Sequence, residues 1–249
     1  NVNAWYDSRF GRTSVGFEIR YEGIYSTKLG EPLDEKDWQA TQGHDATSGI
    51  NYTNQADRVN QSAFIEHDIL LRDWTISLGL LANHNTALDS RWRIYPGVDI
   101  SYRPTQHWKL FASWNMALRM PTFTDLYYSV GGHLADKNLK AEKMQALEGG
   151  LRYSRRGVNA VLSVYYNMGS DMIDWIKDEA DGPDAVWKSV NYTKVNTFGQ
   201  EIDVRLDFRN ILLREEFFLR TLDLSYSHIS QDKKETPGIY SRYSLEYVR

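Results

Sequence analysis

The stretch that decides the fold runs from Trp108 to Leu118 and reads Trp-Lys-Leu-Phe-Ala-Ser-Trp-Asn-Met-Ala-Leu. Every second side chain, beginning with Trp108, is apolar, whereas Lys109, Ser113 and Asn115 fall between them. Because successive side chains of a β-strand point to opposite faces, the stretch predicts a strand with one apolar face and one polar face. The same alternation recurs along most of the chain, and it is clearest from Glu201 to Arg209.

The connections between the predicted strands alternate between short turns and long polar loops. Read in this way, the chain holds about eleven strands. Short turns are expected near residues 11, 73, 105, 156 and 211. Long connections are expected over Thr27–Asn60, His84–Arg91, Arg119–Lys143 and Asp171–Asn196, and again near residue 234. This order of connections is typical of outer-membrane barrels, so the sequence predicts an all-β antiparallel meander forming part of a large transmembrane β-barrel.

Aromatic residues stand beside the short turns. They are Trp74, Tyr102, Trp108 and Tyr153. Barrels of the outer membrane carry aromatic girdles at the membrane interface, and this placement predicts a periplasmic girdle. The opposite strand face carries charged residues, which are Arg93, Asp99, Arg103, Lys109, Asp203, Arg205 and Asp207. Buried charges need partners or water, which favours an aqueous lumen, although one solvated face of a soluble sheet would accept the same residues.

Composition excludes several classes of protein. The chain has 249 residues, 25% of them charged and 41% hydrophobic, and none is cysteine. No stretch approaches the roughly 18 consecutive apolar residues that a membrane helix needs. Without cysteine there is no disulfide framework and no cysteine-based metal or redox centre. The formal net charge of -4 offers no basic surface for nucleic acid.

The two ends of the sequence suggest a piece of a longer protein. Asn1 is not preceded by an export signal, and Arg249 interrupts an alternating run that begins at Tyr240. Residues 1–249 are therefore expected to form one partial barrel domain, with its final strands not present.

Three short motifs resemble those of the TonB-dependent outer-membrane transporters. The first, from Arg119 to Tyr128, carries the family's Arg-x-Pro box ending in Leu-Tyr. The second, from Asn138 to Glu142, is similar to the family's Asn-Leu-Lys-Pro-Glu, with Ala141 in place of proline, and Glu148 follows in a Glu-x-Gly strand. The third, from Val195 to Glu201, is similar to the family's entry into a later strand. Hairpin spacing extends the resemblance over nearly the whole chain.

The resemblance implies a function and a set of partners. It implies a 22-stranded barrel, of which about eleven strands are half, plugged by an N-terminal domain that is absent from this sequence. The family imports a scarce nutrient, an iron–siderophore, haem or cobalamin, through the bacterial outer membrane, with energy from TonB acting on the plug. Lipid and a surface lipoprotein are further expected partners. The protein would be no enzyme and would need no cofactor.

The family motifs are expected to be structural. Their residues are Arg119, Pro121, Leu126, Tyr127, Asn138, Leu139, Glu142, Glu148, Gly199 and Glu201. The resemblance also suggests ligand contacts, because haem-uptake members carry a histidine between the first two motifs, and His133 stands there. Aromatic residues of the long loops suit capture of planar ligands, and they are Tyr127, Tyr128, Trp175 and Trp187. A weak calcium candidate comprises Asp178, Asp181 and Asp184.

Three other functions stay open at this point. A passive outer-membrane porin or channel would share the alternation and the charged lumen, but it would not explain the motifs. A soluble β-sheet binding protein predicts folding without detergent. An outer-membrane enzyme would need a nucleophile, a base and an orienting acid within reach, whereas the six histidines are scattered and no Gly-x-Ser-x-Gly occurs.

Overall fold

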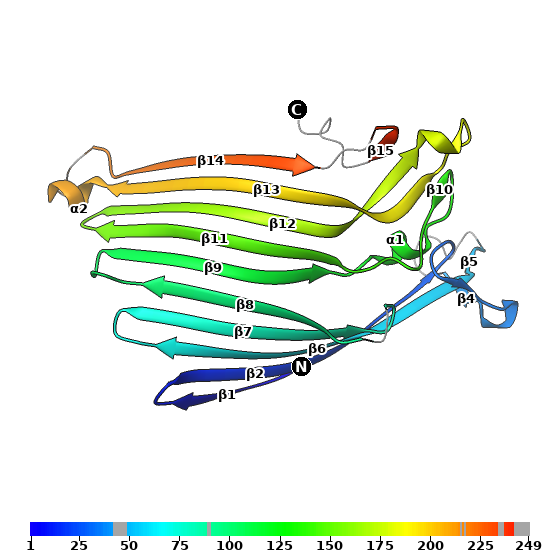
Figure 1. Ribbon diagram of the computed structural model, residues 1–249, viewed down its shortest axis with the longest axis horizontal. Coiled ribbons are helices and arrows are strands. Elements are labelled where there is room, and N and C mark those ends of the chain that lie inside the picture. Colours follow the sequence, from blue (N-terminus) through cyan, green and yellow to red (C-terminus); the bar gives the residue numbers. More distant parts are fainter. Residues whose placement is uncertain (42–48, 89–90, 215, 217, 234–236, 242–249) are drawn as a thin grey trace.

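The computed structural model describes residues 1–41, 49–88, 91–214, 216, 218–233 and 237–241. Most of them lie in a long antiparallel meander (Figure 1). The wall strands are β1 (Val2–Ser8), β2 (Gly11–Ser26), β6 (Asn54–Leu70), β7 (Trp74–Asn85), β8 (Arg93–Tyr102), β9 (Trp108–Arg119), β11 (Glu142–Arg155), β12 (Val158–Asp178), β13 (Trp187–Asp207) and β14 (Thr221–Lys233). Within the described ranges β1 pairs only with β2 and β14 only with β13, so this sheet is open.

The meander of long strands is called the wall below, and shorter elements lie in the connections at its two ends. They are β3 (Glu31–Pro32), η1 (Glu35–Asp37), β4 (Gln39–Ala40), β5 (Asn51–Tyr52), α1 (Phe123–Tyr127), β10 (His133–Leu134), η3 (Glu179–Asp181), α2 (Phe208–Leu212) and β15 (Ile239–Ser241). Apart from α2, they gather at the end of the wall where the long connections lie (Figure 1). In the described ranges, no helix is long and apolar enough to span a membrane.

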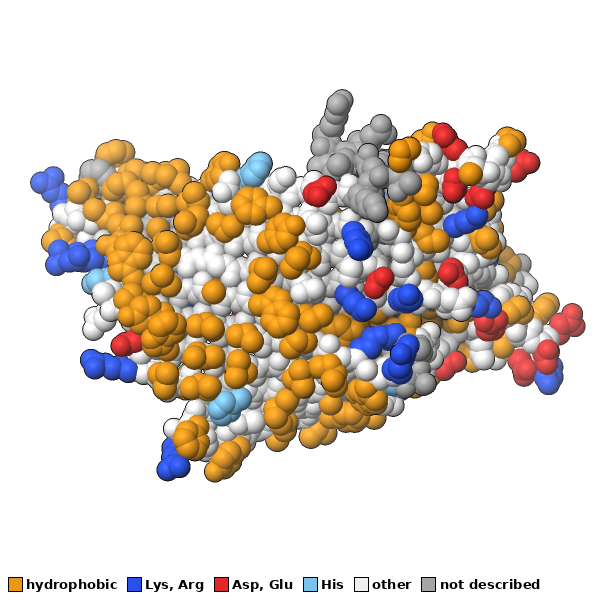
Figure 2. Space-filling model, in the orientation of Figure 1, with side chains coloured by type: hydrophobic (Ala, Val, Ile, Leu, Met, Phe, Trp, Pro, Cys, Tyr) orange, Lys and Arg blue, Asp and Glu red, His pale blue; other side chains and the backbone are white. Residues whose placement is uncertain are grey.

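The register of the wall separates an apolar face from a polar one. Cross-strand partners form one apolar row of Leu78, Val98, Trp114, Leu147, Tyr166 and Phe198. The neighbouring row, on the other face, is Ser77, Asp99, Ser113, Glu148, Tyr165 and Gly199. Figure 2 shows hydrophobic side chains spread over the strands of one face. An exposed apolar surface of this extent is typical of contact with lipid.

The predicted aromatic girdle forms cross-strand pairs. Trp74 stacks on Tyr102 with 4.4 Å between ring centroids, and Trp108 lies 4.7 Å from Tyr153. Both pairs join directly opposed residues of neighbouring strands beside the short turns. Aromatic cross-strand pairs stabilise a sheet through contact area that single aromatic residues lack.

Charged residues of the polar face accept hydrogen bonds from neighbouring residues or donate hydrogen bonds to them. Arg205 Nε donates to Asp223 Oδ1 over 2.6 Å across the β13–β14 ladder. Asp203 accepts a hydrogen bond of 2.6 Å from the hydroxyl of Ser225 on the same ladder. Asp207, expected on this face, accepts hydrogen bonds from the backbone amides of Arg209 and Asn210 in α2. Exposed pairs of this kind contribute little stability, so they fix side-chain positions rather than the fold.

The predicted bounds of two long loops are wrong because polar strand ends lack the alternation. The loop expected over Thr27–Asn60 ends earlier, since Asn54–Asn60 extends β6 and pairs with β2. The loop expected over Asp171–Asn196 shrinks to residues 179–186, because β12 and β13 continue to pair. The fifth turn, expected near residue 211, is long and contains α2. The strand expected from Tyr240 falls mainly on residues outside the described ranges.

The two faces of β9 give a direct test. Trp114→Arg places a charge on the apolar face, and we expect it to destabilise the protein in lipid by about 2–4 kcal/mol. The matched control, Ser113→Arg, points to the polar face and should cost less than about 1 kcal/mol. Urea unfolding from lipid vesicles measures both values. Equal costs at the two positions would contradict the assignment of the faces.

Candidate functional site

The candidate site is built on the connection between β9 and β11, residues 120–141, called here the crossing segment. Its short helix α1 begins with a capping box, in which Thr122 Oγ1 accepts from Asp125 N over 3.1 Å and the Asp125 carboxylate accepts from Thr122 N over 2.9 Å. Leu126 and Leu139 of the segment are buried against Ile173 of β12, with Tyr127 packed beside them. The connection is therefore folded onto the wall.

An ion pair closes the base of the crossing segment. Arg119 Nε donates to Glu142 Oε2 over 2.6 Å, and a second contact joins Arg119 Nη2 to Glu142 Oε1. The Glu142 side chain is nearly buried and also accepts from the backbone amide of Ile173 over 2.8 Å. Ionised, two-pronged contacts of this kind are among the stronger hydrogen bonds in proteins. Arg119 and Glu142 thus hold β9, β11 and β12 together where the segment leaves the wall.

Other motif residues lie away from this base. Glu148 lines a concave region of about 480 Å³ on the polar face, together with Asp99, Lys109 and Arg152. Gly199 lies beneath the ring of Tyr165, where an added Cβ would come within 2.1 Å of the ring carbon Cζ. Only glycine leaves room for that ring.

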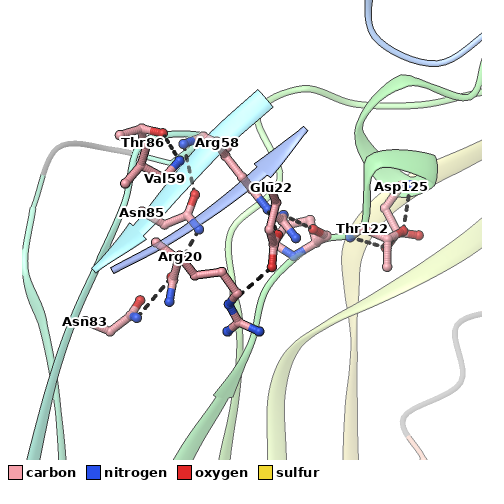
Figure 3. A network of polar contacts seen from close by, with 12 residues as sticks. Arg20, Glu22, Arg58, Val59, Asn83, Asn85, Thr86, Thr122 and Asp125 are labelled. Carbon is pink, nitrogen blue, oxygen red and sulfur yellow. Dashed lines mark hydrogen bonds and ion pairs between the residues drawn. The ribbon is translucent and has the colours of Figure 1, made fainter. Parts of the chain in front are cut away.

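One side of the crossing segment is tied to β2 and β6 through Arg58. Its Nε donates to Glu22 Oε2 over 2.5 Å and its Nη1 donates to the Pro121 carbonyl over 2.6 Å. The guanidinium also lies 4.8 Å from the ring centroid of Phe123, the first residue of α1. Figure 3 shows Arg58 and Glu22 between the end of β7 and the Thr122–Asp125 cap.

The other side is tied to β13 through Asn191. Its Nδ2 donates to the carbonyls of Lys140 and Asp171 over 2.9 and 2.7 Å, and its Oδ1 accepts from Lys140 N over 2.7 Å. The strand β10 adds a parallel ladder to β13, and Trp187 N donates to Gly132 O over 2.8 Å. The crossing segment is therefore held at strands far apart in the sheet order.

Buried asparagines stiffen the wall next to Arg58. Asn83 Nδ2 and Asn85 Nδ2 donate to the same Asn60 Oδ1 over 3.1 and 3.2 Å. Thr86 Oγ1 accepts from Val59 N over 2.8 Å (Figure 3). Buried polar groups with satisfied hydrogen bonds favour one arrangement of the backbone. No sequence motif marked these residues, and none marked Arg58 or Asn191.

The predicted ligand residues lie close together, with one exception. The rings of Tyr128, His133 and Trp175 pack edge to face, with 5.6 Å from Tyr128 to His133 and 5.3 Å from His133 to Trp175. Trp187 is the ladder partner of His133. Tyr127 instead packs beside Leu126 and Leu139. Tyr128, His133 and Trp175 are called the aromatic cluster below.

Neither ring nitrogen of His133 is freely accessible. Its Nδ1 lies 3.2 Å from the carbonyl oxygen of Gly131, while Nε2 is buried and has no hydrogen-bond partner. An axial haem ligand needs an accessible ring nitrogen. Haem ligation by His133 would therefore require this part of the crossing segment to rearrange.

The carboxylates of the calcium candidate, Asp178, Asp181 and Asp184, do not converge on a common site. Asp178 accepts from Ala180 N over 2.9 Å and Asp181 pairs with Lys188 over 2.7 Å. In the described part of the chain, no group of three or more His, Asp or Glu side chains that could hold a metal comes together, and Asp184 joins none. Glu179 accepts a hydrogen bond from the hydroxyl of Tyr240, which raises the pKa of that phenol.

The base of the crossing segment can be tested by truncation. Glu142→Ala leaves the buried amide of Ile173 without its partner and removes the charge that faces Arg119, so we expect a loss of about 1–3 kcal/mol in the free energy of unfolding. Glu148→Ala, on the same strand, should change it by less than about 0.5 kcal/mol. Denaturant unfolding of both variants measures this. A Glu142→Ala variant as stable as the control would refute the anchoring role.

Comparison with known proteins agrees with this architecture. The family model described as "TonB dependent receptor-like, beta-barrel" matches residues 2–247. The chain is 26% identical over 196 residues to the vitamin B12 transporter BtuB of Vibrio vulnificus, and 21% identical over 193 residues to that of Photobacterium profundum. Each match covers 77% of this chain and 30% of the relative, so the chain spans about 30% of the length of these relatives.

Solved structures show the same fold at low sequence identity. The siderophore receptor PirA from Pseudomonas aeruginosa gives a TM-score of 0.68 at 15% identity, covering 92% of this chain and 38% of that one. The copper transporter OprC gives 0.65 at 17% identity, covering 92% and 37%. The resemblance drawn from the motifs is confirmed: the chain belongs to the TonB-dependent receptor β-barrel family, whose members lie in the bacterial outer membrane.

Proposed function

We propose that this chain forms part of the wall and of the ligand-capture loops of an outer-membrane transporter that imports a scarce nutrient. The observation that carries the proposal is the crossing segment, which is anchored at two distant parts of an apolar-outside, polar-inside wall. A passive pore would not need a connection folded and fixed in this way. No chemical bond is made or broken, and the protein is not an enzyme under this proposal.

The energy and the partners follow from the family. TonB acts through a plug domain, outer-membrane lipid covers the apolar face, and a surface lipoprotein is a candidate partner at the loop end. These parts of the proposal rest on family membership, because the chain spans about 30% of its curated relatives.

Cobalamin is the ligand that we propose to test first. Both curated relatives named above are vitamin B12 transporters, whereas the siderophore and copper transporters support the fold alone at 15–17% identity. A corrin ring offers a broad face for contact with aromatic side chains such as Tyr128 and Trp175. Iron–siderophores and haem are the alternatives, and haem ligation is disfavoured by the buried Nε2 of His133.

Ligand retention by the detergent-purified protein that carries this chain tests the proposal. Cyanocobalamin, haem and ferric siderophores are offered separately, and we expect cobalamin to be retained. Trp175→Ala removes one ring of the aromatic cluster and should weaken cobalamin binding about tenfold, which corresponds to about 1.4 kcal/mol. Trp74→Ala, in the girdle at the other end of the wall, is the matched control and should bind as the wild type does.

The other outcomes separate the alternatives. Haem retention that disappears in His133→Ala would contradict the cobalamin assignment and make His133 a haem ligand. Siderophore retention without cobalamin retention would move the protein to the iron-uptake members. Retention of none of the three ligands would favour a passive pore and refute the proposed function.

A further inference from the structure

We propose that Arg58 is a positioning residue for ligand capture, which holds the start of the crossing segment against the β2–β6 part of the wall and so fixes the position of Tyr128. The inference rests on the proposed function, because it assigns a role in ligand binding. No motif of the sequence marks Arg58, and the residue lies in a region expected to be a loop.

The guanidinium of Arg58 is nearly buried and is hydrogen-bonded through two of its nitrogens. Only 12% of the Arg58 side chain is exposed, and Glu22 of β2 supplies the opposite charge at 2.5 Å. Such a desolvated cation is costly unless its partners are fixed in good geometry. Arg58 uses a second nitrogen, Nη1, for the carbonyl of Pro121, so one side chain joins two β-strands to the crossing segment.

A short path leads from Arg58 to the aromatic cluster. Pro121 is almost fully buried, and the next residue, Thr122, caps α1. The backbone amide of Tyr128 donates to Thr124 O over 3.0 Å at the end of this helix. The Tyr128 ring then packs on His133. Because only the short capped helix α1 separates Pro121 from Tyr128, a displacement of the Pro121 backbone would also displace Tyr128.

The backbone of Arg58 cannot follow the crossing segment. Val59 and Asn60, the next residues on β6, are hydrogen-bonded to Thr86, Asn83 and Asn85. This places the Arg58 backbone on the stiff part of the wall (Figure 3). The guanidinium therefore acts as a fixed point for the segment rather than moving with it.

The other ties of the crossing segment do not replace Arg58. On the same side, Lys137 pairs with Glu31 at 2.5 Å, but both side chains are 57% exposed, and pairs so exposed contribute little. The ties through Asn191 and β10 hold the distant side of the segment. Removal of the Arg58 guanidinium should therefore loosen the α1 end and leave the wall folded.

The variants are Arg58→Met, Arg58→Lys and the control Arg20→Met, all made in the detergent-purified protein that carries this chain. Arg20 also lies near Glu22, at 3.5 Å, but its side chain is 58% exposed and belongs to the wall alone. Lysine can pair with Glu22 but has no planar fork to reach Pro121 O at the same time. Two quantities are measured: amide hydrogen exchange over α1, and cyanocobalamin affinity.

We expect Arg58→Met to raise exchange at Leu126 and Tyr128 about tenfold and to weaken cyanocobalamin binding about tenfold, with exchange in β11 and β12 unchanged. Arg58→Lys should give exchange rates and an affinity between those of the wild type and Arg58→Met. If Arg58→Met does not fold, the comparison of Arg58→Lys with the wild type is the test. Arg20→Met should match the wild type in both. A purely structural role would instead raise exchange throughout the wall.

The failures of the two proposals are distinguishable. If the wild type binds cyanocobalamin and the Arg58 variants bind it equally well, the positioning role is refuted while the proposed function stands. Unchanged exchange over α1 in the Arg58 variants refutes the positioning role as well. If the wild type retains none of cyanocobalamin, haem and ferric siderophores, the proposed function fails, and this inference falls with it.

Discussion

Backbone hydrogen bonding is the constraint on which the rest of the structure depends. In lipid no water is available for N–H and C=O groups, so each wall strand must pair with its neighbours over its whole length. A continuous ladder in turn forces successive side chains to alternate between the two faces. The apolar row through Trp114 and the polar row through Ser113 are the direct result. A single register slip would exchange the two faces.

Burial within the protein imposes a similar requirement on the crossing segment, which lies at the loop end of the wall. Its residues leave the ladder, so their backbone groups need other partners. The Pro121 carbonyl accepts a hydrogen bond from Arg58, and the backbone N–H and C=O of Lys140 are both hydrogen-bonded to Asn191. Because these partners stand on strands far apart in the sheet, the segment spans the wall instead of extending from one hairpin. This is what brings Tyr128 onto His133 and Trp175.

The sequence predicted the features that depend on local order. Alternation identified the membrane-facing strands, and the turn-proximal placement of Trp74 and Tyr102 matched their stacking. Features that depend on distant partners were missed. Arg58 meets Pro121 across 63 positions of the chain, and nothing near Arg58 in the sequence signals that contact. Strand ends such as Asn54–Asn60 read as loops in the sequence, because a ladder outside the membrane needs no apolar face.

The central claim is that alternate residues of the wall strands face lipid, and β9 allows it to be tested residue by residue. Residues 1–249 hold no cysteine, so each single cysteine introduced from Trp108 to Leu118 is the one site within them that takes a spin label in lipid vesicles. We predict that labels at the even-numbered positions are accessible to oxygen dissolved in the bilayer and that labels at the odd-numbered positions are not. Equal accessibility along the strand would contradict this description of the wall.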